Sequence, residues 1–505
     1  MQGTKCKEFK TYGRISLDEL MPKDHFYRHL EAKLDLSFVR DLVANCYVPR
    51  GRPSIDPVVY FKLQLIMFFE DIRSERKLLE TVEVNIAHRW YLGYDLAEKL
   101  PHHSSLTKIR QRYGVTVFHR FFERITELCQ EAGLVWGEEL YIDATKVSAN
   151  AAIDSMVPRW YWEALHPEDQ TDETPVRQDL PASERLIQQY NGRRLTDRRR
   201  KTYQRKADQQ LNPYDPDTTP MKRFPGDRAR LGYHTHYVVD GGKSRIILAC
   251  LVTPASIMEN TPALDLIRWV RFRWHLHPQI VVGDTTYGTV PNFVGLAQDG
   301  IRAYFPVPDH SQRNAFYDRE RFTYDTEHDL FLCPQNQELP LHKVSRSENE
   351  WVYRAPARVC NACVVKSRCT NSKSGQYIRR SFFQDFLDQA TSYRDTPAYQ
   401  KTMRKRQVWI EPLFGEAKQW HGLRHFRLHR LPQVNIQNLV IAAGQNLKRL
   451  LQHLGWGRRW FPTGNSAVLP LPSHFIFVLL LFQVIQVNGG LHKLNFSFFN
   501  RLDNS

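Results

Sequence analysis

Two short apolar segments of the chain each end in an aspartate, and this pattern constrains the fold more than any other feature. Asp143 follows a β-like run in YIDATKVSAN, residues 141–150, and Asp284 follows another in QIVVGDTTYG, residues 279–288. Aspartate is a poor strand former, and its charge is costly in a buried strand unless a cation meets it. Either residue alone could simply cap the next turn. Together they indicate a shared site, because open α/β sheets place their chemistry at strand ends.

The segments around these aspartates alternate between strand-like and helix-like patterns. From residue 137 the order is ELYIDA, HTHYVVD, SRIILACLVTP, the helical TPALDLIRWVRFRW, QIVVGD and IRAYFPVP. This order predicts a mixed sheet with helices on its faces. Two stretches do not fit the sheet and are predicted to be insertions, a basic polar one at 155–225 and a cysteine-bearing one at 311–399. The α/β core therefore takes residues 137–310 plus a helical segment at 400–452.

Residues 1–130 are predicted to form an all-helical domain. In DPVVYFKLQLIMFFEDI, Asp56 is the expected N-cap and Pro57 the first helical residue, and apolar residues then recur at helical spacing. In HHSSLTKIRQRYG, Ser104 or Ser105 can cap a short basic helix. Its basic side chains are Lys108, Arg110 and Arg112. Such a helix fits a helix-turn-helix reader of DNA, and it fits a solvated helix face equally well.

The charge of the chain points to a polyanionic partner. A compact protein with a formal net charge of +16 repels itself unless a polyanion compensates, and nucleic acid is the usual one. An anionic membrane surface is the alternative, but MQGTKCKEFK shows no apolar core behind its lysines, so no signal peptide is expected. The apolar run at 475–487 has about 13 residues, short of the roughly 20 that a spanning helix needs. No membrane partner is therefore predicted, and the tail at 455–505 receives no functional interpretation.

A third acid is predicted in RQVWIEPLFGEAK. Glu411 and Lys418 are seven residues apart, so on one continuous helix they lie within about 20° of each other, and Arg404 extends the stripe. Pro412 disfavours helical geometry at Glu411, so the stripe can begin there and leave Arg404 outside.

Three carboxylates can hold two Mg²⁺ ions by oxygen ligation, and paired metals suit phosphodiester transfer. Such ions would compensate the charge of Asp143, and Lys146 would then face a DNA phosphate.

Several motifs, in their order and separation, resemble a known family. YIDATKVSANA, GYHTHYVVD with IILACLVTP, GDTTYG, and IEPLFGEAKQWHGLRHFR followed by QNLKRL resemble the DDE transposases of bacterial insertion sequences, in the broad IS4, IS5 and IS1182 group and closest to IS1182-like members. The run from GRPSIDPVVYFK to HHSSLTKIRQR resembles the helical DNA-binding domain of the same group.

The resemblance implies an RNase H-like catalytic fold with Asp143, Asp284 and Glu411 as its first, second and third acids. It implies two Mg²⁺ or Mn²⁺ ions at this triad. It also places two residues, Tyr287 and Lys418, near the DNA end. The arginine that the family keeps four residues before the glutamate is Gln407 here, with Arg406 next to it, so the resemblance leaves the identity of the arginine contact open.

Four cysteines form the pattern C-x26-C-x2-C-x5-C. They are Cys333, Cys360, Cys363 and Cys369. Four thiolates suit tetrahedral Zn²⁺, and LCPQNQEL around the first has the Cys-Pro turn of a metal knuckle. Free or redox-active cysteines are the alternative, since the C-x5-C half is wider than usual. A zinc ion here would be structural, and the resemblance to IS1182-like members favours it.

The leading hypothesis is an enzyme that cuts DNA at the ends of a mobile element and joins them to target DNA. Its partners would be double-stranded terminal inverted repeats and target DNA, bound as a homodimer when two ends are synapsed, in the bacterial cytoplasm and associated with the nucleoid. Two basic segments, 190–206 and 424–430, would hold backbone phosphates. A non-catalytic DNA-binding regulator and an RNase H-like nuclease without strand transfer remain as alternatives.

Overall fold

The computed structural model describes residues 16–48, 54–166, 185–187, 189, 209–222, 226–308 and 316–456. The basic segment at 190–206 and the apolar run at 475–487 lie outside these ranges, so what the sequence predicts for them stays a prediction. Within the described ranges, no helix has the length and apolar character needed to cross a membrane.

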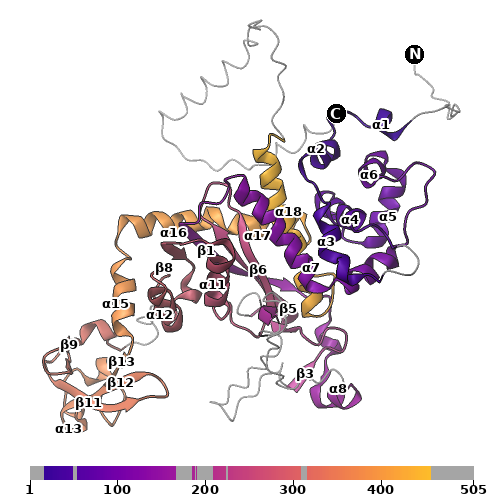
Figure 1. Cartoon of the computed structure of the whole chain (residues 1–505). Coiled ribbons are helices and arrows are strands. Elements are labelled where there is room, and N and C mark those ends of the chain that lie inside the picture. The colour runs from indigo at the N-terminus through magenta and orange to yellow at the C-terminus, as the bar shows by residue number, and fades with distance from the viewer. Residues whose placement is uncertain are drawn as a thin grey trace, which may run out of the picture. The chain divides into compact units, whose positions relative to one another are not determined.

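Helices form the N-terminal part of the fold, drawn in indigo and purple in Figure 1. They are α1 (Leu17–Leu20), α2 (Phe26–Lys33), α3 (Phe38–Val43), α4 (Pro57–Phe69), α5 (Glu75–Val84), α6 (Ile86–Leu92) and α7 (His103–Glu131), with a short 3₁₀ turn, η1, at Ala44–Cys46. The predicted start of α4 is confirmed, because the Asp56 carboxylate accepts the N–H of Val58 and Pro57 lies in the first turn. The predicted start of α7 is wrong. The ring of His102 caps this helix by accepting the N–H of Ser104, so both serines lie inside the helix, which is interrupted by a kink at Gly114.

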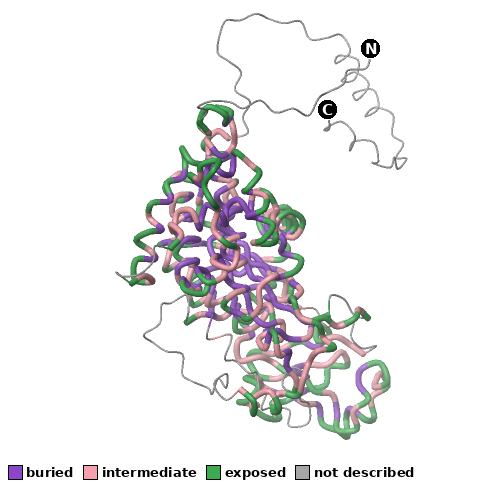
Figure 2. Tube along the Cα trace, turned by 90° about the vertical axis from the view of Figure 1, so that its right-hand side faces the viewer, coloured by how far each residue is buried: buried purple, intermediate pink, exposed green. Residues whose placement is uncertain are grey.

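A mixed sheet forms the core of the described chain, as the alternating sequence pattern predicts. Its strands are β1 (Glu139–Ser148), β4 (Thr219–Met221), β5 (Arg230–Asp240), β6 (Ile247–Pro254), β7 (Ile280–Val282) and β8 (Arg302–Tyr304). The order is β6–β5–β1–β7–β8, and β4 pairs with the start of β5. Neighbours among β6, β5 and β1 are antiparallel, whereas β7 and β8 run parallel to β1. Every residue of β6 is buried, and Figure 2 draws this interior in purple.

The helices around the sheet are α11 (Ala263–Trp274), α12 (Val290–Gln298), α16 (Pro397–Trp409), α17 (Glu411–Trp420) and α18 (Leu431–His453). Helix α18 packs against β6 on one side and against α7 and α4 on the other. It also covers the outer edge of β6. The side-chain amide of Asn435 bonds to both backbone groups of Val252, at 2.8 and 3.1 Å, and Asn446 does the same to Ile247, at 2.9 and 2.8 Å.

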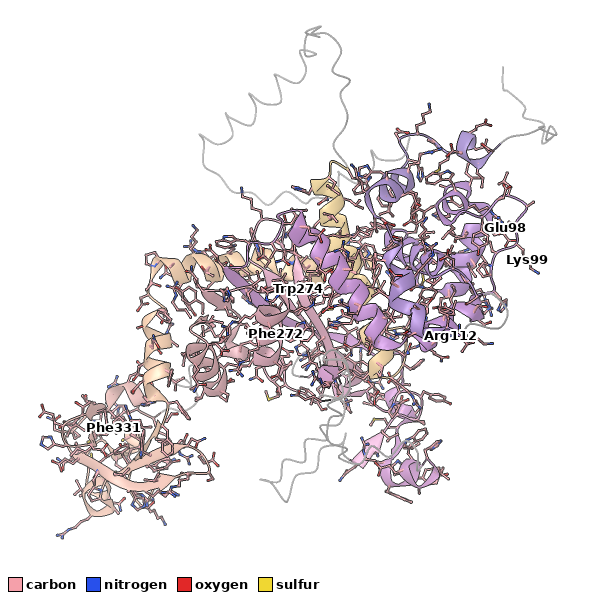
Figure 3. All side chains as sticks on the ribbon, viewed as in Figure 1. Glu98, Lys99, Arg112, Phe272, Trp274 and Phe331 are labelled. Atoms are coloured by element: carbon pink, nitrogen blue, oxygen red, sulfur yellow. The ribbon has the colours of Figure 1, made fainter. Side chains whose placement is uncertain are left out.

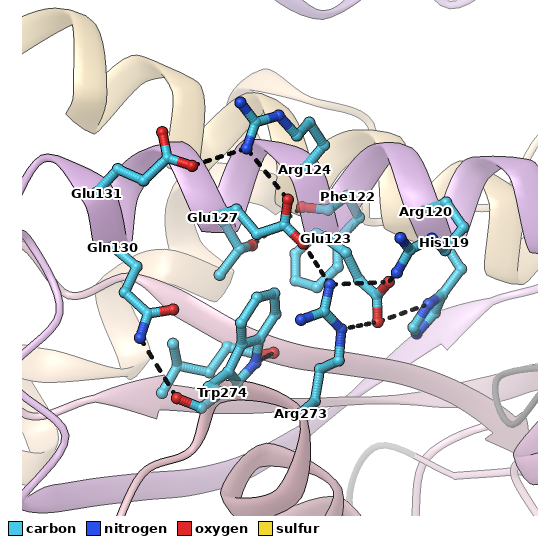
Figure 4. A network of polar contacts seen from close by, with 12 residues as sticks. His119, Arg120, Phe122, Glu123, Arg124, Glu127, Gln130, Glu131, Arg273 and Trp274 are labelled. Atoms are coloured by element: carbon cyan, nitrogen blue, oxygen red, sulfur yellow. Dashed lines mark hydrogen bonds and ion pairs between the residues drawn. The ribbon is translucent and has the colours of Figure 1, made fainter. Parts of the chain in front are cut away.

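Ion pairs join the C-terminal half of α7 to α11 (Figure 4). Glu123 is almost fully buried and accepts from Arg273 Nε at 2.9 Å, while Arg120 pairs with the same carboxylate from its own helix. Arg273 also reaches Glu127, and Gln130 donates to the carbonyl of Trp274 at 3.3 Å. Because α7 and α18 both contact the core, the N-terminal helices and the sheet share one continuous cluster of buried apolar residues.

The cysteine-bearing stretch folds as an antiparallel sheet with a small core of its own. Its strands lie in the order β13–β12–β11–β10–β9, and Phe331, labelled in Figure 3, is buried among them. The elements are η6 (Arg319–Arg321), β9 (Thr323–Asp325), β10 (Leu330–Leu332), β11 (Glu338–Ser345), β12 (Glu350–Arg354), α13 (Ala357–Asn361), α14 (Lys366–Cys369), β13 (Tyr377–Ser381) and α15 (Gln384–Ser392). Shorter elements elsewhere are η2 (Ile153–Ser155), β2 (Val157–Pro158), α8 (Arg159–Leu165), β3 (Gln210–Leu211) and η4 (Thr285–Tyr287).

Candidate active site

The parallel register of β1 and β7 brings Asp143 and Asp284 together. The last pair between these strands joins Tyr141 to Val282. Asp143 follows Tyr141 by two residues and Asp284 follows Val282 by two, so both acids lie just beyond the point where the strands part, on one face. The sequence suggested that Asp143 ends its strand. In the structure β1 continues to Ser148 along β5, so Asp143 loses only its β7 neighbour.

Arg406 lies within ion-pair distance of all three predicted acids. Its Nη2 lies 2.9 Å from the Asp143 carboxylate and 3.9 Å from that of Asp284, and its Nη1 lies 3.7 Å from that of Glu411. The exposed fraction of the side chain increases from the first acid to the third. It is 10% for Asp143, 35% for Asp284 and 55% for Glu411. The three carboxylates therefore surround one guanidinium, with Asp143 buried and Glu411 exposed.

A break between α16 and α17 explains which arginine makes this contact. On one continuous helix, five residues separate two side chains by about 140°, so Arg406 and Glu411 would face different directions. Helix α16 ends at Trp409 and α17 begins at Glu411, with Ile410 between them. Gln407, which occupies the position that the resemblance assigns to arginine, is exposed.

Burial makes Asp143 the most perturbed of these acids. Desolvation raises the pKa of its carboxyl from 3.8 to about 7, although Arg406 and the N–H of Ala144 act to lower it. The nearby negative charges of Asp284 and Glu259 raise the pKa further. The ionised carboxylate is thus held in an environment that lacks enough positive charge for it.

Lys405 fixes the end of α16 to the sheet. Its ammonium donates to the Glu139 carboxylate at 2.9 Å and to the carbonyl of Gly241 at 2.8 Å. It also lies over the rings of three aromatic residues, at 5.6, 5.4 and 4.6 Å from their centroids. These are Trp136, Tyr141 and Trp409. Glu139 and Tyr141 belong to β1, the strand that carries Asp143, so this contact determines where the neighbouring Arg406 lies relative to that acid.

The two predicted lysines lie on opposite faces of β1. Lys418 reaches the hydroxyl of Thr145, which shares a face with Asp143 because side chains two apart on a strand point the same way. Lys146 points to the other face, where its ammonium donates to the carbonyl of Lys222 at 3.0 Å. In this structure Lys418, and not Lys146, therefore lies on the side of the acids.

Tyr287 lies beneath the acids and not on the surface. It is fully buried, and its hydroxyl has no hydrogen-bond partner among the described residues. Burial, followed by the charges of Asp143 and Asp284, raises the pKa of this phenol well above its usual value. A neutral, buried tyrosine in this position packs beneath the acids. A direct contact between Tyr287 and DNA would require the side chain to become exposed.

Sequence reasoning missed a fourth carboxylate, that of Glu259. Burial raises its pKa, Lys146 lowers it, and the charge of Asp284 raises it again. The next residue, Asn260, donates to the carbonyl of Thr286 at 3.0 Å, which ties this loop to the turn after Asp284. An acid shortly after β6 was the available signal, but nothing in the local pattern distinguishes it from an ordinary turn residue.

The donor set fits a divalent cation. Three carboxylates and one guanidinium leave two negative charges uncompensated, and carboxylate oxygens are the ligands that Mg²⁺ and Mn²⁺ prefer. In the part of the chain that the structure describes, no three His, Cys, Asp or Glu side chains are arranged to hold a metal ion directly. At the triad, the Arg406 guanidinium pairs with all three carboxylates.

The three basic residues predicted on one helix have different environments. Lys108 and Arg112 are exposed on α7, and Arg112, labelled in Figure 3, lies over the Tyr47 ring at 5.3 Å. Arg110 is buried and pairs with Glu75. The structure thus presents Lys108 and Arg112 to a ligand at the surface and does not present Arg110.

The four cysteines of the predicted zinc site lie in the small sheet domain, and none of them is in a disulfide. Burial raises the pKa of the Cys369 thiol to about 11, and the charges of the other three cysteines add to the shift. Within the described residues, these four thiols are not arranged to hold a metal ion directly. Backbone N–H groups point at two of the sulfurs. Gln335 and Gln337 donate to Cys333 at 3.4 Å each, and Gln376 donates to Cys360 at 3.3 Å.

Two family models match the chain. One, described as Transposase domain (DUF772), matches residues 15–112, and the other, Transposase DDE domain, matches residues 332–451. The second match contains Arg406 and Glu411 but neither aspartate. No curated protein matches the chain.

Among solved structures, the piggyBac transposase synaptic complex with hairpin DNA matches at 10% identity, over 85% of this chain and 76% of that one, with a TM-score of 0.32. The two domain matches, one from each end of the described chain, identify it as a DNA transposase of the DDE class.

Proposed function

We propose that this transposase cleaves DNA at the ends of an insertion sequence of the IS4, IS5 and IS1182 group and joins them to target DNA, using Asp143, Asp284 and Glu411. The observation that carries the proposal is the convergence of these three acids on Arg406. The strand order, with three antiparallel strands followed by two parallel ones, supports an RNase H-like catalytic fold for the core.

The three carboxylates would hold two Mg²⁺ or Mn²⁺ ions. Paired ions of this kind activate an attacking oxygen and stabilise a leaving one. The chain's own residues supply the rest. Arg406 balances part of the acidic charge and holds the three carboxylates together before DNA arrives. Lys418, on the same face as Asp143, is placed to meet a phosphate beside them.

The second proposal concerns the cysteine domain. Cys333, Cys360, Cys363 and Cys369 would hold one structural Zn²⁺ once their side chains turn toward one another, supported by their place in one small domain and by the N–H groups that point at Cys333 and Cys360. Metal analysis of the purified chain should find one zinc per chain, and a variant with Cys360→Ser and Cys363→Ser should lose it. Zinc content that is absent, or unchanged in the variant, would show that these are ordinary thiols.

A strand-transfer assay separates transposition from the two alternatives. Labelled DNA ends, taken from the sequence flanking the coding region, are incubated with the chain, Mg²⁺ and a target plasmid. A regulator only shifts the labelled band, a nuclease only cuts it, and a transposase also joins it to the plasmid. Asp143→Asn, Asp284→Asn and Glu411→Gln should each abolish joining while keeping the shift. We expect two chains in the joined complex, because two ends must be held at once.

A further inference from the structure

A cavity of about 280 Å³ lies between the N-terminal helices and the core. One wall comes from α4 and α7, and the opposite wall from the segment after α17 and from α18. Its lining combines apolar side chains with polar ones that include Gln64, Arg110 and Arg427, and the Asp71 carboxylate in the lining is paired with Arg73 at 3.0 Å. None of these side chains takes part in the acidic site.

Two arginines in this wall share one carboxylate, and Arg110 is buried whereas the side chain of Arg427 is 26% exposed. Arg110 pairs with Glu75 Oε1, and Arg427 Nη1 lies 3.5 Å from the same oxygen. The other polar contact of Arg110 is neutral, since its Nε donates to Gln433 at 3.1 Å. Two positive charges and one negative charge leave one positive charge in excess. Burial and the neighbouring Arg110 lower the pKa of the Arg427 guanidinium, as expected for a cation that lacks a full partner.

An unsatisfied donor faces the same space. Gln64 is only 4% exposed, and its amide nitrogen has no hydrogen-bond partner within the described ranges. A buried amide N–H that finds no acceptor is costly, so such groups usually meet a ligand or a water. The hydroxyl of Tyr60, next to the arginine pair, is likewise buried and without a partner among the described side chains.

We propose that this cavity binds one phosphate group of the DNA on which the transposase acts. A phosphodiester carries one negative charge, which matches the excess charge of the arginine pair, and its oxygens accept from both guanidinium and amide N–H groups. The inference rests on the proposed function, and it differs from simple surface contact. Gln64 and Arg110 belong to the N-terminal helices whereas Arg427 belongs to the core, so a bound phosphate would tie the two parts together.

The first test uses the full chain and inorganic phosphate, without DNA. Thermal unfolding is followed while phosphate replaces chloride at constant ionic strength. Phosphate should raise the Tm of the native chain, and the rise should be lost in Arg427→Gln and Gln64→Leu. Glu75→Gln removes the shared carboxylate. In this variant, half of the phosphate-dependent rise in Tm should be reached at a lower phosphate concentration than in the native chain. Lys99→Gln, an exposed change shortly before α7 and outside the cavity, should behave like the native chain.

Opposite responses of Arg427→Gln and Glu75→Gln distinguish a binding site from general damage, which would weaken both. No phosphate-specific rise in the native chain, or equal weakening in both variants, would overturn the proposal.

The second test asks whether the phosphate belongs to DNA. Binding of a labelled element end is measured at several salt concentrations. Losing one phosphate contact should reduce the slope of log K against log salt by about 0.9 in Arg427→Gln. Phosphate-dependent stabilisation with an unchanged slope would show that the cavity takes free phosphate, and would overturn the DNA assignment. Asp143→Asn should keep the phosphate response even though it cannot join DNA, so loss of strand transfer alone leaves this proposal standing.

Discussion

The Arg406 guanidinium lies 2.9 Å from the Asp143 carboxylate and is the cation nearest to that acid in the described chain. It lowers the pKa of a carboxyl that burial has raised to about 7. Removing this cation by Arg406→Gln should therefore raise the pKa further, and the pH at which DNA cleavage is half-maximal should move upward, because metal ligation needs the ionised carboxylate. Cleavage at pH 7 should fall roughly 100-fold or more, a loss of about 2.7 kcal/mol of transition-state stabilisation.

The pH profile of Arg406→Gln is the decisive measurement. The control is Arg404→Gln, at an exposed residue half a turn earlier on α16. This variant should keep the pH profile of cleavage that the native chain shows. An Arg406→Gln profile that falls in height without moving along the pH axis would contradict the role given to Arg406.

Neutralising Asp143 should stabilise the fold above neutral pH. Its folded pKa of about 7 lies above the unfolded value of 3.8, so the folded state binds the proton more tightly. Proton binding to Asp143 therefore adds to the free energy of unfolding at low pH, and this contribution is lost as the pH rises through 7. Asp143→Asn removes this loss, which at 1.36 kcal/mol per pKa unit is up to about 4 kcal/mol. The Tm difference between variant and native chain should be larger at pH 8.5 than at pH 5.5, and an equal difference at both would exclude this cause.

Lys405→Ala should slow cleavage about 10- to 100-fold with little change in DNA affinity. The reason is positional, since Lys405 contacts no acid of the triad but fixes the end of α16 to Glu139 and Gly241. Losing that contact frees Arg406 and Glu411 to move, and small displacements of positioned groups cost this much in rate. Single-turnover cleavage and equilibrium DNA binding, measured together, test the separation. Lys401→Ala, an exposed residue one turn earlier, should change neither.

The acids were predictable from sequence because each stands in a short, recognisable context. Asp143 and Asp284 follow apolar β-like runs, and Glu411 begins a helix next to Pro412. What the sequence could not supply is the register that places the two aspartates side by side. Tyr141 pairs with Val282, and that pairing depends on contacts between segments about 140 residues apart.

The basic residues were harder to place, and the physical reason differs among them. Arg110 looks like part of an exposed basic helix, but Glu75 draws it into the interior. Lys146 follows Asp143 at a distance of three residues, so strand alternation sends it to the opposite face. Arg406 lies on α16 and Glu411 begins α17, so the two residues belong to successive helices that meet at Ile410. The partner of Arg110 arises from tertiary structure and is not visible in a local pattern, whereas Pro412 is a local signal for the break between the helices.

The last prediction concerns the edge of β6. Asn435 and Asn446 are eleven residues apart on α18, a distance of about 16 Å along a helix, and Ile247 and Val252 are five apart on a strand, also about 16 Å. This match lets both amides bond to the backbone of the strand. Asn446→Leu should leave the N–H and C=O of Ile247 buried without partners and lower the free energy of unfolding by about 2–5 kcal/mol, as expected for two unsatisfied groups. Urea unfolding measures the loss, with Gln452→Ala on the exposed face of α18 as its control. A change below about 1 kcal/mol would mean that β6 holds its place by apolar packing alone.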